Sequence, residues 1–415
     1  MNGKNRKILW QIVPMIVILF TAAILVTWQI TYNYTKNEMN EKYSQMLSQV
    51  TAENDISRVM YNVDSILRSK YIGEIDSQKL ADSTIQGYVY GLGDKYAYYM
   101  NAEEFAEYML ETSDGVKTGI GVTVVYDNSA GGMYVTSVYK DTPASKGGIV
   151  PGEVITRVNG KLVTEIGYNL AVEEIGNGEE GSSVELTVMS ESGTERAVTL
   201  KREIIKLETV TWRMLNSDTG LITISEFTLN TPEEFKNAIQ DLTVNGAQRF
   251  IFDVRNNPGG NLEGISETLD FLLPEGNIII INEKSGTQRT IVSDTAEFSA
   301  PMAVLVNGNT ASAAELFTAA LRDYDKAEIV GETTYGKGSM QEIVNLPGGG
   351  AASVSVSTYL PPCGVSYDGE GIDPDYPVSL PEETLQNYHK MTDEQDLQLQ
   401  KAIEIVAAME VNTYQ

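Results

Sequence analysis

One segment, from Met302 to Arg322, constrains the fold of this chain more than any other. It begins as an unbroken apolar strand, Met302–Val306, passes through a polar linker that contains Ser312, and continues as an alanine-rich helix from Ala313. Strands and helices alternate around it over residues 205–380, so the sequence predicts an α/β core with helices packed on a sheet. The other expected strands are Leu221–Ile224, Arg249–Val254, Asn277–Ile281 and Ala327–Val330, and the other expected helices are Pro232–Leu242 and Glu263–Leu272.

The linker serine has a chemical partner farther along the chain. Lys337 lies between Gly336 and Gly338, and Gln341 follows four positions after the lysine. A serine hydroxyl becomes a good nucleophile only when a base removes its proton, and a lysine amine can do so when burial lowers its pKa from about 10.4. Backbone N–H groups at the start of a helix, with the positive end of its dipole, would face the reaction centre at Ser312. We therefore expect Ser312 as nucleophile, Lys337 as base and Gln341 as the group that orients the amine.

Composition argues against other catalytic arrangements that hydrolases use. The only histidine is His389 and the only cysteine is Cys363, so a Ser-His-Asp triad would need that one histidine, and neither an intramolecular disulfide nor a zinc-protease site can form. No metal or other cofactor is expected. Ser137 and Lys140 have the S-x-x-K spacing of penicillin-binding enzymes, but they fall in an expected strand, where positions three apart point to opposite faces. We expect His389 to be exposed on a polar terminal helix and Cys363 to be a packed loop thiol.

A series of motifs in a fixed order makes the chain resemble the carboxy-terminal processing, or tail-specific, serine proteases of peptidase family S41. The motifs are Gly91–Tyr96, Thr118–Val122, Phe252–Gly260, Asn307–Glu315, Gly331–Gln341 and Gly371–Asp375. The resemblance implies a crotonase-like, Clp-protease-like α/β core and a Ser312–Lys337 dyad assisted by Gln341. It also puts the oxyanion donors on the backbone N–H of Ala313 and on Gly259 or Gly260, a choice that the sequence leaves open. Asp253 and Arg255 are expected to form a structural pair under the Asn-Pro-Gly-Gly turn.

Residues 113–203 resemble an inserted, β-rich PDZ domain. Thr118, Gly119, Ile120 and Gly121 form a glycine-rich turn whose backbone N–H groups can hold the terminal carboxylate of a peptide that adds as an extra strand. The domain is therefore expected to read the C-terminal tails of protein substrates, with a purely structural brace as the alternative. Many family members carry an arginine just after the PDZ helix. This chain has none in residues 174–181, so coupling of peptide binding to catalysis through that arginine is in doubt.

The N-terminal part carries a candidate membrane anchor. Ile8–Ile30 has no charged residue and is long enough to cross a hydrocarbon core of about 30 Å, while Lys4, Arg6 and Lys7 precede it. The positive-inside rule then puts the N-terminus in the cytoplasm and the catalytic domain on the outer side of the cell membrane. A cleaved signal peptide is the alternative, but the run is long for one, and Trp28-Gln29-Ile30 is a poor cleavage site.

The expected domain order follows from these assignments. It is a cytoplasmic tip and single membrane span at 1–30, a helical region at 31–112, the PDZ domain at 113–203, the protease core at 204–380 and a C-terminal helix at 381–415. In the family the N-terminal helices often take part in dimer contacts, so a homodimer is expected; a helix packed on its own domain is the alternative. The apolar residues that predict this helix are Met46, Val50, Ile56, Val59, Val63 and Ile66.

Two other functions compete with the membrane-anchored protease. One is a catalytically silent PDZ scaffold, against which the presence of Ser312, Lys337 and Gln341 argues. The other is a protease that is inactive at rest and gated by its PDZ domain. The net charge of −27 argues against nucleic acid as a partner of any of them.

Overall fold

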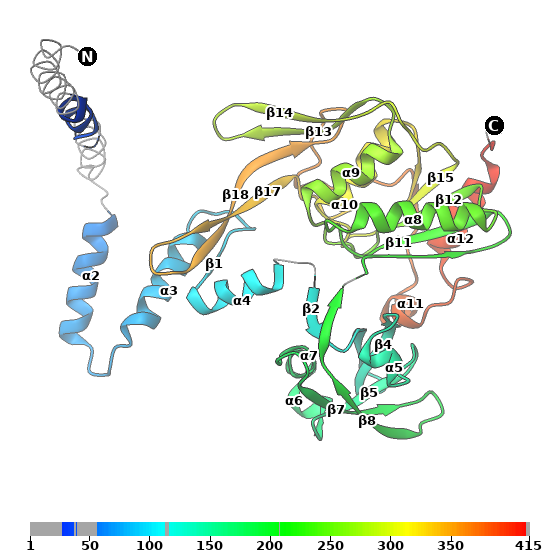
Figure 1. Cartoon of the computed structure of the whole chain (residues 1–415), viewed down its shortest axis with the longest axis horizontal. Helices are drawn as coiled ribbons and strands as arrows, with labels where there is room; N and C mark the ends of the chain where they lie inside the picture. The colour runs from blue at the N-terminus through cyan, green and yellow to red at the C-terminus, as the bar shows by residue number, and fades with distance from the viewer. Residues whose placement is uncertain (1–26, 37–38, 40–55, 113–115, 207, 412–415) are drawn as a thin grey trace, which may run out of the picture. The chain divides into compact units, whose positions relative to one another are not determined.

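The structure, a computed structural model, describes residues 27–36, 39, 56–112, 116–206 and 208–411 (Figure 1). The chain divides into two compact units, Met1–Ala81 and Asp82–Gln415. Most of the expected span Ile8–Ile30 lies outside the described residues, and none of the helices within them is both long and apolar enough to cross a bilayer.

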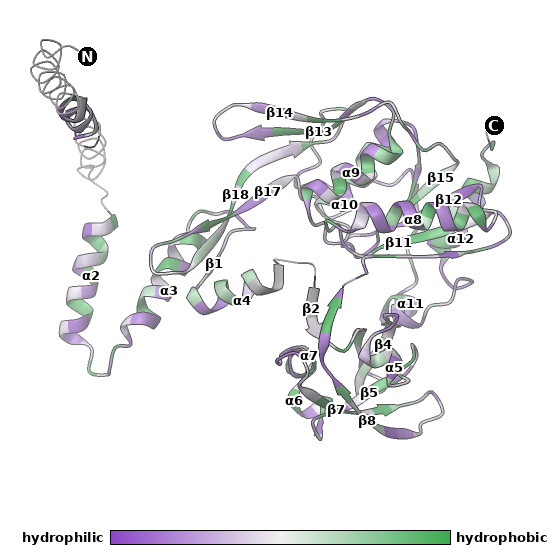
Figure 2. Ribbon diagram, viewed as in Figure 1, coloured by the Kyte–Doolittle hydropathy of each residue, from purple (hydrophilic) through white to green (hydrophobic). Residues whose placement is uncertain are grey.

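The first unit contains a helix that buries none of its side chains. This helix, α2, spans Ile56–Lys70 and carries hydrophobic and hydrophilic residues interspersed along its length (Figure 2). Its apolar residues Val59 and Ile66 are 53% and 60% exposed. The expected helical positions Met46 and Val50 lie outside the described residues. The apolar stripe at helical spacing is therefore present on α2, and it faces solvent.

A six-stranded sheet forms the centre of the protease core. Its order is β10-β11-β12-β15-β16-β19, with β10 antiparallel to β11 and all later neighbours parallel. The strands are β10 (Val210–Met214), β11 (Thr219–Ile224), β12 (Arg249–Asp253), β15 (Met302–Val306), β16 (Glu328–Gly331) and β19 (Tyr376–Pro377), and the helices between them are α8 (Thr231–Val244), α9 (Leu262–Leu272) and α10 (Ala313–Asp323). The strands and helices expected here are confirmed, and their ends differ from expectation by about two residues at most.

Alternate residues of the central strand β15 face opposite layers of helices. Ala303 and Leu305 pack with α12 (Leu397–Ala408), while Val304 and Val306 face the larger core formed with α8, α9 and α10. Every residue of β15 is buried, which explains why its apolar run shows no alternation. Helices thus cover both faces of the sheet and give an α/β/α arrangement (Figure 1).

A second, antiparallel sheet stands beside the first and is largely missed by the sequence analysis. Its order is β1-β18-β13-β14, and β17 also pairs with β18. The strands are β1 (Tyr98–Met100), β13 (Gly276–Glu283), β14 (Gln288–Ser293), β17 (Ser339–Asn345) and β18 (Ala351–Leu360), and the helices flanking β1 in sequence are α3 (Ser77–Tyr90) and α4 (Ala102–Thr112). Only β13 is among the expected strands. Residues 76–112 are therefore a helical cap with one strand, because β1 pairs with β18.

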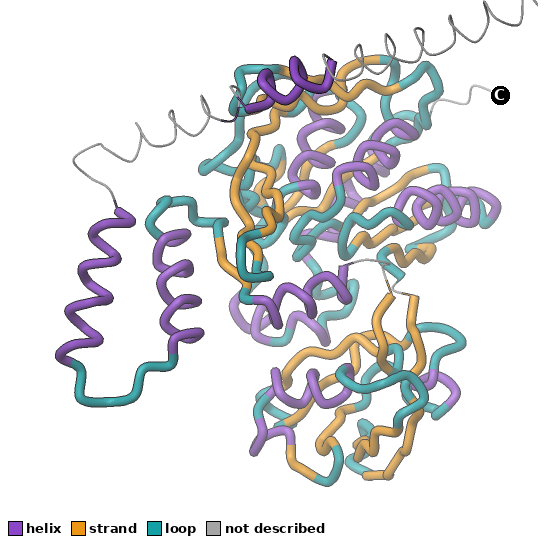
Figure 3. The backbone as a smooth tube through the Cα atoms, turned by 60° about the vertical axis from the view of Figure 1, so that its left-hand side comes forward, coloured by secondary structure: helices purple, strands orange, loops and turns teal. Residues whose placement is uncertain are grey.

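The PDZ domain has its own six-stranded sheet, separate from those of the core (Figure 3). Its order is β3-β4-β5-β7-β8, with β6 paired to β5, and a ribbon of β2 and β9 lies where the chain enters and leaves the domain. The elements are β2 (Val116–Gly119), β3 (Val122–Asp127), β4 (Gly132–Val138), α5 (Pro143–Lys146), β5 (Val154–Val158), β6 (Lys161–Leu162), α6 (Val163–Ile166), α7 (Tyr168–Gly176), β7 (Ser183–Met189), β8 (Glu195–Lys201) and β9 (Glu203–Lys206). Because β3 pairs only with β4, its other edge is open to an added strand.

The C-terminal segment corrects the expectation for His389. It consists of α11 (Glu382–Gln386), the short 3-10 helix η1 (Tyr388–Lys390) and α12. The His389 side chain is only 14% exposed, since its ring packs 4.8 Å from that of Tyr134 in the PDZ domain and its Nε2 lies 3.9 Å from the Asp127 carboxylate. Lys390 also binds Asp127. The expectation of an exposed histidine is wrong because nothing in the local sequence indicates that η1 packs on the PDZ domain.

The expectation for Cys363 is also wrong. The cysteine is exposed, because it lies in a surface turn directly after β18. Its backbone N–H donates to the Asp323 carboxylate at 2.9 Å, which fixes the turn rather than packing the thiol.

Candidate active site

Ser312, Lys337 and Gln341 line one cavity of about 250 Å³ in the protease core. It lies where the loops after the parallel strands β12 and β15 meet β17 and β18 of the antiparallel sheet. The rest of the lining is mostly apolar and consists of Pro258, Gly260, Leu262, Ile265, Ala313, Leu316, Ser339, Met340 and Tyr359. The fold thus brings the three expected catalytic residues together, although they come from two different sheets.

Ser312 has a strained backbone conformation at the start of α10. Its φ of +57° lies in the left-handed region that residues with a side chain rarely adopt. The loops after β12 and β15 are tied together, since the Thr310 hydroxyl donates to the Val254 carbonyl and the Ala311 N–H to the Asn257 carbonyl, both at 2.9 Å. These bonds hold the turn in place, so the strain persists and the serine is presented to the cavity.

The two glycines of the Asn-Pro-Gly-Gly turn differ in their hydrogen bonds. The Gly259 N–H donates to the Asn257 side-chain oxygen at 2.8 Å. Within the described part of the chain, neither the Gly260 N–H nor the Ala313 N–H donates to a protein acceptor. A Cβ on Gly259 would stand 2.6 Å from the Ser312 Cβ, so the backbone approaches the serine as closely as only glycine permits.

Glu315 ties the segment of the nucleophile to the segment of the lysine. Its side chain is fully buried, and Oε2 accepts from the Ser312 N–H at 2.9 Å and the Lys337 N–H at 2.8 Å. Oε1 accepts from the Thr334 hydroxyl at 2.5 Å and the Gly336 N–H at 2.6 Å. Four donors compensate for the burial of this charge. The sequence analysis missed this role, although a serine followed three residues later by a glutamate at a helix start is the signal of a capping box.

The Lys337 side chain lines both the cavity at Ser312 and a second cavity of about 400 Å³ that is rich in tyrosine. The amine nitrogen stands 4.9 Å from the centre of the Tyr96 ring. Among the described residues, the structure has no hydrogen bond from this amine to Ser312 or to Gln341. Lys337 and Ser312 therefore line the same cavity without a hydrogen bond between their side chains; such bonds are often absent from an active site before substrate binds.

The surroundings of Lys337 act on its charge in opposite directions. Burial is the largest effect and lowers the pKa of the amine below its ordinary value. The carboxylates of Asp94 and Glu315 favour the ammonium form and oppose this shift. Because burial prevails, more of the amine is neutral at a given pH than for a solvated lysine, as the role of a base requires.

Gln341 is bonded to the strands rather than to the lysine. Its side-chain amide donates to the Ser339 carbonyl at 3.3 Å, to the Ser339 hydroxyl at 3.1 Å and to the Ser355 hydroxyl at 3.1 Å. These partners lie on β17 and β18. The structure places Gln341 at the site, and its role in orienting the amine stays a prediction.

Tyr359 on β18 is a site residue that the sequence analysis missed. Its buried hydroxyl lies 2.6 Å from the Lys337 carbonyl and 3.1 Å from the Ser312 Oγ. A hydroxyl that donates its one proton to the carbonyl keeps lone pairs that can accept the proton of the serine. Burial raises the pKa of Tyr359, so the phenol is neutral. No local pattern identifies this residue, because its position depends on the pairing of β17 with β18.

The structural pair expected under the turn is confirmed. The Arg255 guanidinium donates to the Asp253 carboxylate at 2.6 and 2.9 Å and to the Asp396 carboxylate at 2.8 and 3.0 Å. Asp396 caps α12 by accepting from the Leu399 N–H. The turn that carries Gly259 and Gly260 is thereby anchored to the C-terminal helix.

The expected peptide-binding residues of the PDZ domain lie at the end of β2 and beside the edge strand β3. Gly121 has a φ of +81°, and a Cβ there would clash with the Thr142 side chain, so this position requires glycine. The edge of β3 is partly occupied, since the Tyr168 hydroxyl at the start of α7 donates to the Val124 carbonyl at 2.9 Å. A peptide that pairs with β3 at this point has to displace that hydroxyl.

An arginine from elsewhere in the PDZ domain binds the end of α7. Arg202 is buried and donates to the Glu174 carbonyl at 2.5 Å and the Ile175 carbonyl at 2.8 Å. It also donates to the Ser182 hydroxyl at 3.0 Å. This arginine stabilises the region where many relatives have theirs, but its donors are directed at the PDZ domain itself.

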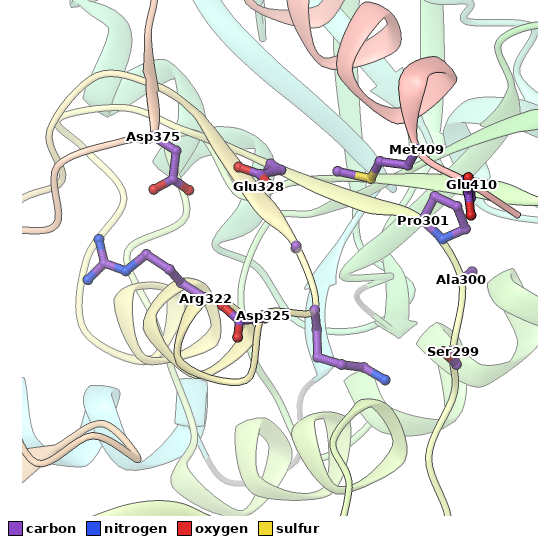
Figure 4. A pocket seen from close by; sticks show the side chains of 11 residues that line it. Ser299, Ala300, Pro301, Arg322, Asp325, Glu328, Asp375, Met409 and Glu410 are labelled. Carbon is purple, nitrogen blue, oxygen red and sulfur yellow. The ribbon is translucent and has the colours of Figure 1, made fainter. Parts of the chain in front are cut away.

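A larger cavity, at the other end of α10, lacks this chemistry. It has a volume of about 340 Å³ and is lined mainly by charged side chains such as Arg322, Glu328 and Asp375 (Figure 4). Its lysine, Lys326, is ion-paired with Glu297 at 3.0 Å. Burial and neighbouring carboxylates raise the pKa of Glu328. Of these two cavities, the smaller one at Ser312 is therefore the candidate active site.

Family models match three consecutive parts of the chain. Peptidase family S41 matches residues 218–378, the PDZ domain matches residues 109–189, and the activating protease CtpB N-terminal domain matches residues 19–104. These matches follow the order of the N-terminal region, the PDZ domain and the protease core.

Relatives match most of the chain. A probable CtpA-like serine protease of Staphylococcus epidermidis is 32% identical over 387 residues, which cover 92% of this chain and 76% of the relative. A probable CtpA-like serine protease of Staphylococcus aureus is 32% identical over 378 residues, with 90% and 73% covered. The solved structure of a putative S41 protease from Bacteroides fragilis shares the fold, with a TM-score of 0.58 at 16% identity over 84% of this chain and 97% of that one. The chain therefore belongs to peptidase family S41, and it is a C-terminal processing serine endopeptidase with a PDZ domain.

Proposed function

We propose that the enzyme cleaves peptide bonds with Ser312 as nucleophile, Lys337 as general base and Gln341 as the group that orients the amine. The observation that carries this proposal is that serine and lysine line one cavity in which burial lowers the pKa of the amine. The neutral amine takes the proton of the serine hydroxyl, and Oγ attacks the peptide carbonyl carbon. The ammonium then returns the proton to the leaving amine, and water that the same amine deprotonates hydrolyses the acyl-enzyme.

The tetrahedral intermediate needs donors for its oxyanion. We assign this role to the backbone N–H groups of Ala313 and Gly260. The support is that the Gly259 N–H already donates to Asn257, whereas those of Gly260 and Ala313 have no protein acceptor among the described residues. Two such donors are each expected to contribute roughly 10²–10³ in rate.

The same cavity favours an apolar side chain on the substrate residue before the cleaved bond. Leu262, Ile265, Leu316 and Met340 line it together with Ser312. A charged side chain would lose its hydration there without gaining a partner. Substrates cut after an apolar residue are therefore expected to be preferred.

The tail of the substrate is proposed to bind the PDZ domain. The open edge of β3 and the glycine-rich turn Thr118–Gly121 support binding of an extended peptide with a free carboxylate. Tail recognition by one domain and cleavage by another would make hydrolysis depend on the C-terminus of the substrate.

We further propose that the enzyme is anchored in the cell membrane by Ile8–Ile30 and acts outside the cytoplasm as a homodimer. The uncharged run and the basic residues before it support the anchor. The exposed apolar residues of α2 support a contact between two copies. Extraction of the full chain by alkaline carbonate would contradict the anchor, and a monomer in detergent by analytical ultracentrifugation would contradict the dimer.

Hydrolysis of an unfolded protein with an apolar C-terminal tail tests the catalytic assignment. Ser312→Ala and Lys337→Ala should each reduce kcat/KM by about 10³-fold or more while the circular dichroism spectrum stays unchanged, since nucleophile and base act as one unit. The matched controls are Ser137→Ala and Lys140→Ala, the other serine and lysine with catalytic spacing. Activity near that of the unmodified enzyme in Ser312→Ala would refute the proposal.

A further inference from the structure

We infer that Tyr96 and Asp94 are positioning residues for Lys337, which hold its amine on the Tyr96 ring and away from Ser312 until substrate binds. The inference rests on the proposed function, because it concerns the group that acts there as base. It gives a role to the motif Gly91–Tyr96, which neither the proposed catalytic chemistry nor peptide recognition uses.

The contact between Lys337 and Tyr96 is direct. The amine nitrogen lies 4.9 Å from the ring centre, within the range of a cation–π interaction. Tyr96 stands in the wall of the second cavity together with Tyr98 and Tyr108 and does not line the cavity at Ser312. Lys337 and Gln341 thus line both the tyrosine-rich cavity and the cavity at Ser312.

Asp94 fixes the backbone at Tyr96, from which the ring extends. One carboxylate oxygen accepts from the Tyr96 N–H at 2.9 Å, and the other accepts from the Ser355 N–H on β18, also at 2.9 Å. The Ser355 hydroxyl in turn accepts from the Gln341 amide at 3.1 Å. The segment before β1 is therefore bonded to the strand that also carries Tyr359, and β1 runs along β18 (Figure 1).

Tyr96, Asp94 and Glu315 oppose the effect of burial, which is the larger one, on the charge of Lys337. An aromatic face and a carboxylate both favour the charged amine, whereas burial favours the neutral one. The groups that face the lysine are the carboxylates of Asp94 and Glu315 and the ring of Tyr96, which the Lys95 ammonium also approaches at 4.7 Å. The phenols of Tyr98 and Tyr108 complete the wall.

A protonated lysine on the Tyr96 ring cannot act as a base. Substrate that fills the nucleophile cavity strengthens the effect of burial and draws the neutral amine toward Ser312. The Asp94–Tyr96 pair is then a restraint on the resting enzyme that sets the pH at which the base becomes available. This restraint joins the cap, residues 76–112, to the protease core and does not need the arginine that is absent from residues 174–181 of the PDZ domain.

The pH dependence of kcat/KM for the full-length enzyme tests the inference. Activity should rise with pH as Lys337 loses its proton. Tyr96→Leu removes a group that favours the ammonium form, so the pKa of Lys337 falls. The midpoint of the rise in kcat/KM should therefore move down by about one pH unit. Tyr96→Phe keeps the aromatic face and is the matched control. Its midpoint should lie within a few tenths of a pH unit of that of the unmodified enzyme. Asp94→Asn should also move this midpoint to lower pH, because it removes a carboxylate that favours the ammonium form.

A second measurement follows the amine without turnover. Lys337 in a Ser312→Ala background is treated with an acetylating reagent at several pH values, and the modified peptide is quantified by mass spectrometry. The reaction rate follows the neutral fraction of the amine, so its midpoint should move down in Tyr96→Leu and stay in place in Tyr96→Phe. A merely structural role of Tyr96 would lower activity at every pH without moving either midpoint.

The outcomes separate this inference from the proposed function. Activity in Lys337→Ala would overturn the base itself. If Lys337→Ala is inactive, the assignment of Lys337 as the base is supported. If the Tyr96→Leu and Tyr96→Phe enzymes then have the same midpoint as the unmodified enzyme in both measurements, the proposed restraint is refuted. If circular dichroism shows that Tyr96→Leu does not fold, Asp94→Asn is used in its place. The same midpoint in Asp94→Asn and in the unmodified enzyme would overturn the inference.

Discussion

Ser312 and Lys337 face the same cavity, but their side chains are held in different ways. The serine sits in a turn whose backbone is bonded to β12, to the Asn-Pro-Gly-Gly loop and to Glu315, and its hydroxyl has Tyr359 as a partner. The Lys337 N–H is also bonded to Glu315, but the lysine amine donates no hydrogen bond to any described residue and lies over the Tyr96 ring. If the two residues act as proposed, the serine is already held in place and the amine has to move toward it.

Removal of Glu315 should have the largest effect, because the segments of Ser312 and Lys337 are both bonded to this side chain. Glu315→Ala leaves four donors without their buried acceptor. We expect a loss of about 3–5 kcal/mol in the free energy of unfolding and about a hundredfold fall in kcat/KM. Urea denaturation and peptide hydrolysis measure these two effects.

An exposed glutamate on the neighbouring helix serves as control for that experiment. Glu267→Ala on α9 should change the free energy of unfolding by about 0.5 kcal/mol or less. A Glu315→Ala enzyme as stable and active as Glu267→Ala would show that the two segments do not need the carboxylate between them.

Tyr359→Phe should have a smaller effect, confined to the chemistry of the serine. The ring that packs 6.3 Å from that of Tyr367 remains, while the hydroxyl between the Lys337 carbonyl and the Ser312 Oγ is lost. We expect about a tenfold fall in kcat/KM, which corresponds to one hydrogen bond of about 1.4 kcal/mol. The fold should be kept, as measured by thermal unfolding.

The control for the tyrosine removes a similar hydroxyl away from the site. Tyr324 donates to the Asn277 carbonyl at 2.9 Å and does not line the catalytic cavity. Tyr324→Phe should therefore leave kcat/KM unchanged. If both substitutions reduce activity equally, the hydroxyl of Tyr359 has no specific role at Ser312.

The same comparison explains which parts of the molecule could be predicted from the sequence. The parallel core is encoded locally: β15 is an apolar run, α10 is alanine-rich, and Ser312 lies between them, so the strand, the helix and the position of the candidate serine could all be predicted. The antiparallel sheet is built by strand pairing: β17 and β18 form a hairpin around Leu346–Gly350 that the sequence analysis did not identify, and β18 also pairs with the distant strands β1 and β13. Tyr359, the environment of Lys337 and the bonds of Gln341 all depend on that pairing, and none could be derived from spacing.

Long-range packing also explains the two errors. His389 lies in a polar stretch of sequence, and only the contact of η1 with Tyr134 and Asp127 buries it. Cys363 has apolar neighbours in sequence, but its turn lies at the surface. In both cases the local sequence does not predict whether the side chain is buried, because burial is decided by packing against segments that are remote in sequence.

The smallest expected effect concerns the PDZ domain and tests whether binding of a tail completes the lysine side of the site. Tyr168→Phe removes the hydroxyl that donates to the Val124 carbonyl on the open edge of β3. A peptide no longer has to displace it, so a C-terminal peptide with a free carboxylate should bind about two- to tenfold more tightly by fluorescence anisotropy. Tyr126→Phe is the matched control, because its ring lies 6.2 Å from that of Tyr168 on the same edge. Equal affinities in the two variants would mean that peptides do not pair with β3 at Val124. If the Tyr168→Phe enzyme binds the tail more tightly but cleaves a separate short peptide no faster when that tail is present, the PDZ domain does not act on Lys337, and the movement of the amine belongs to the protease core alone.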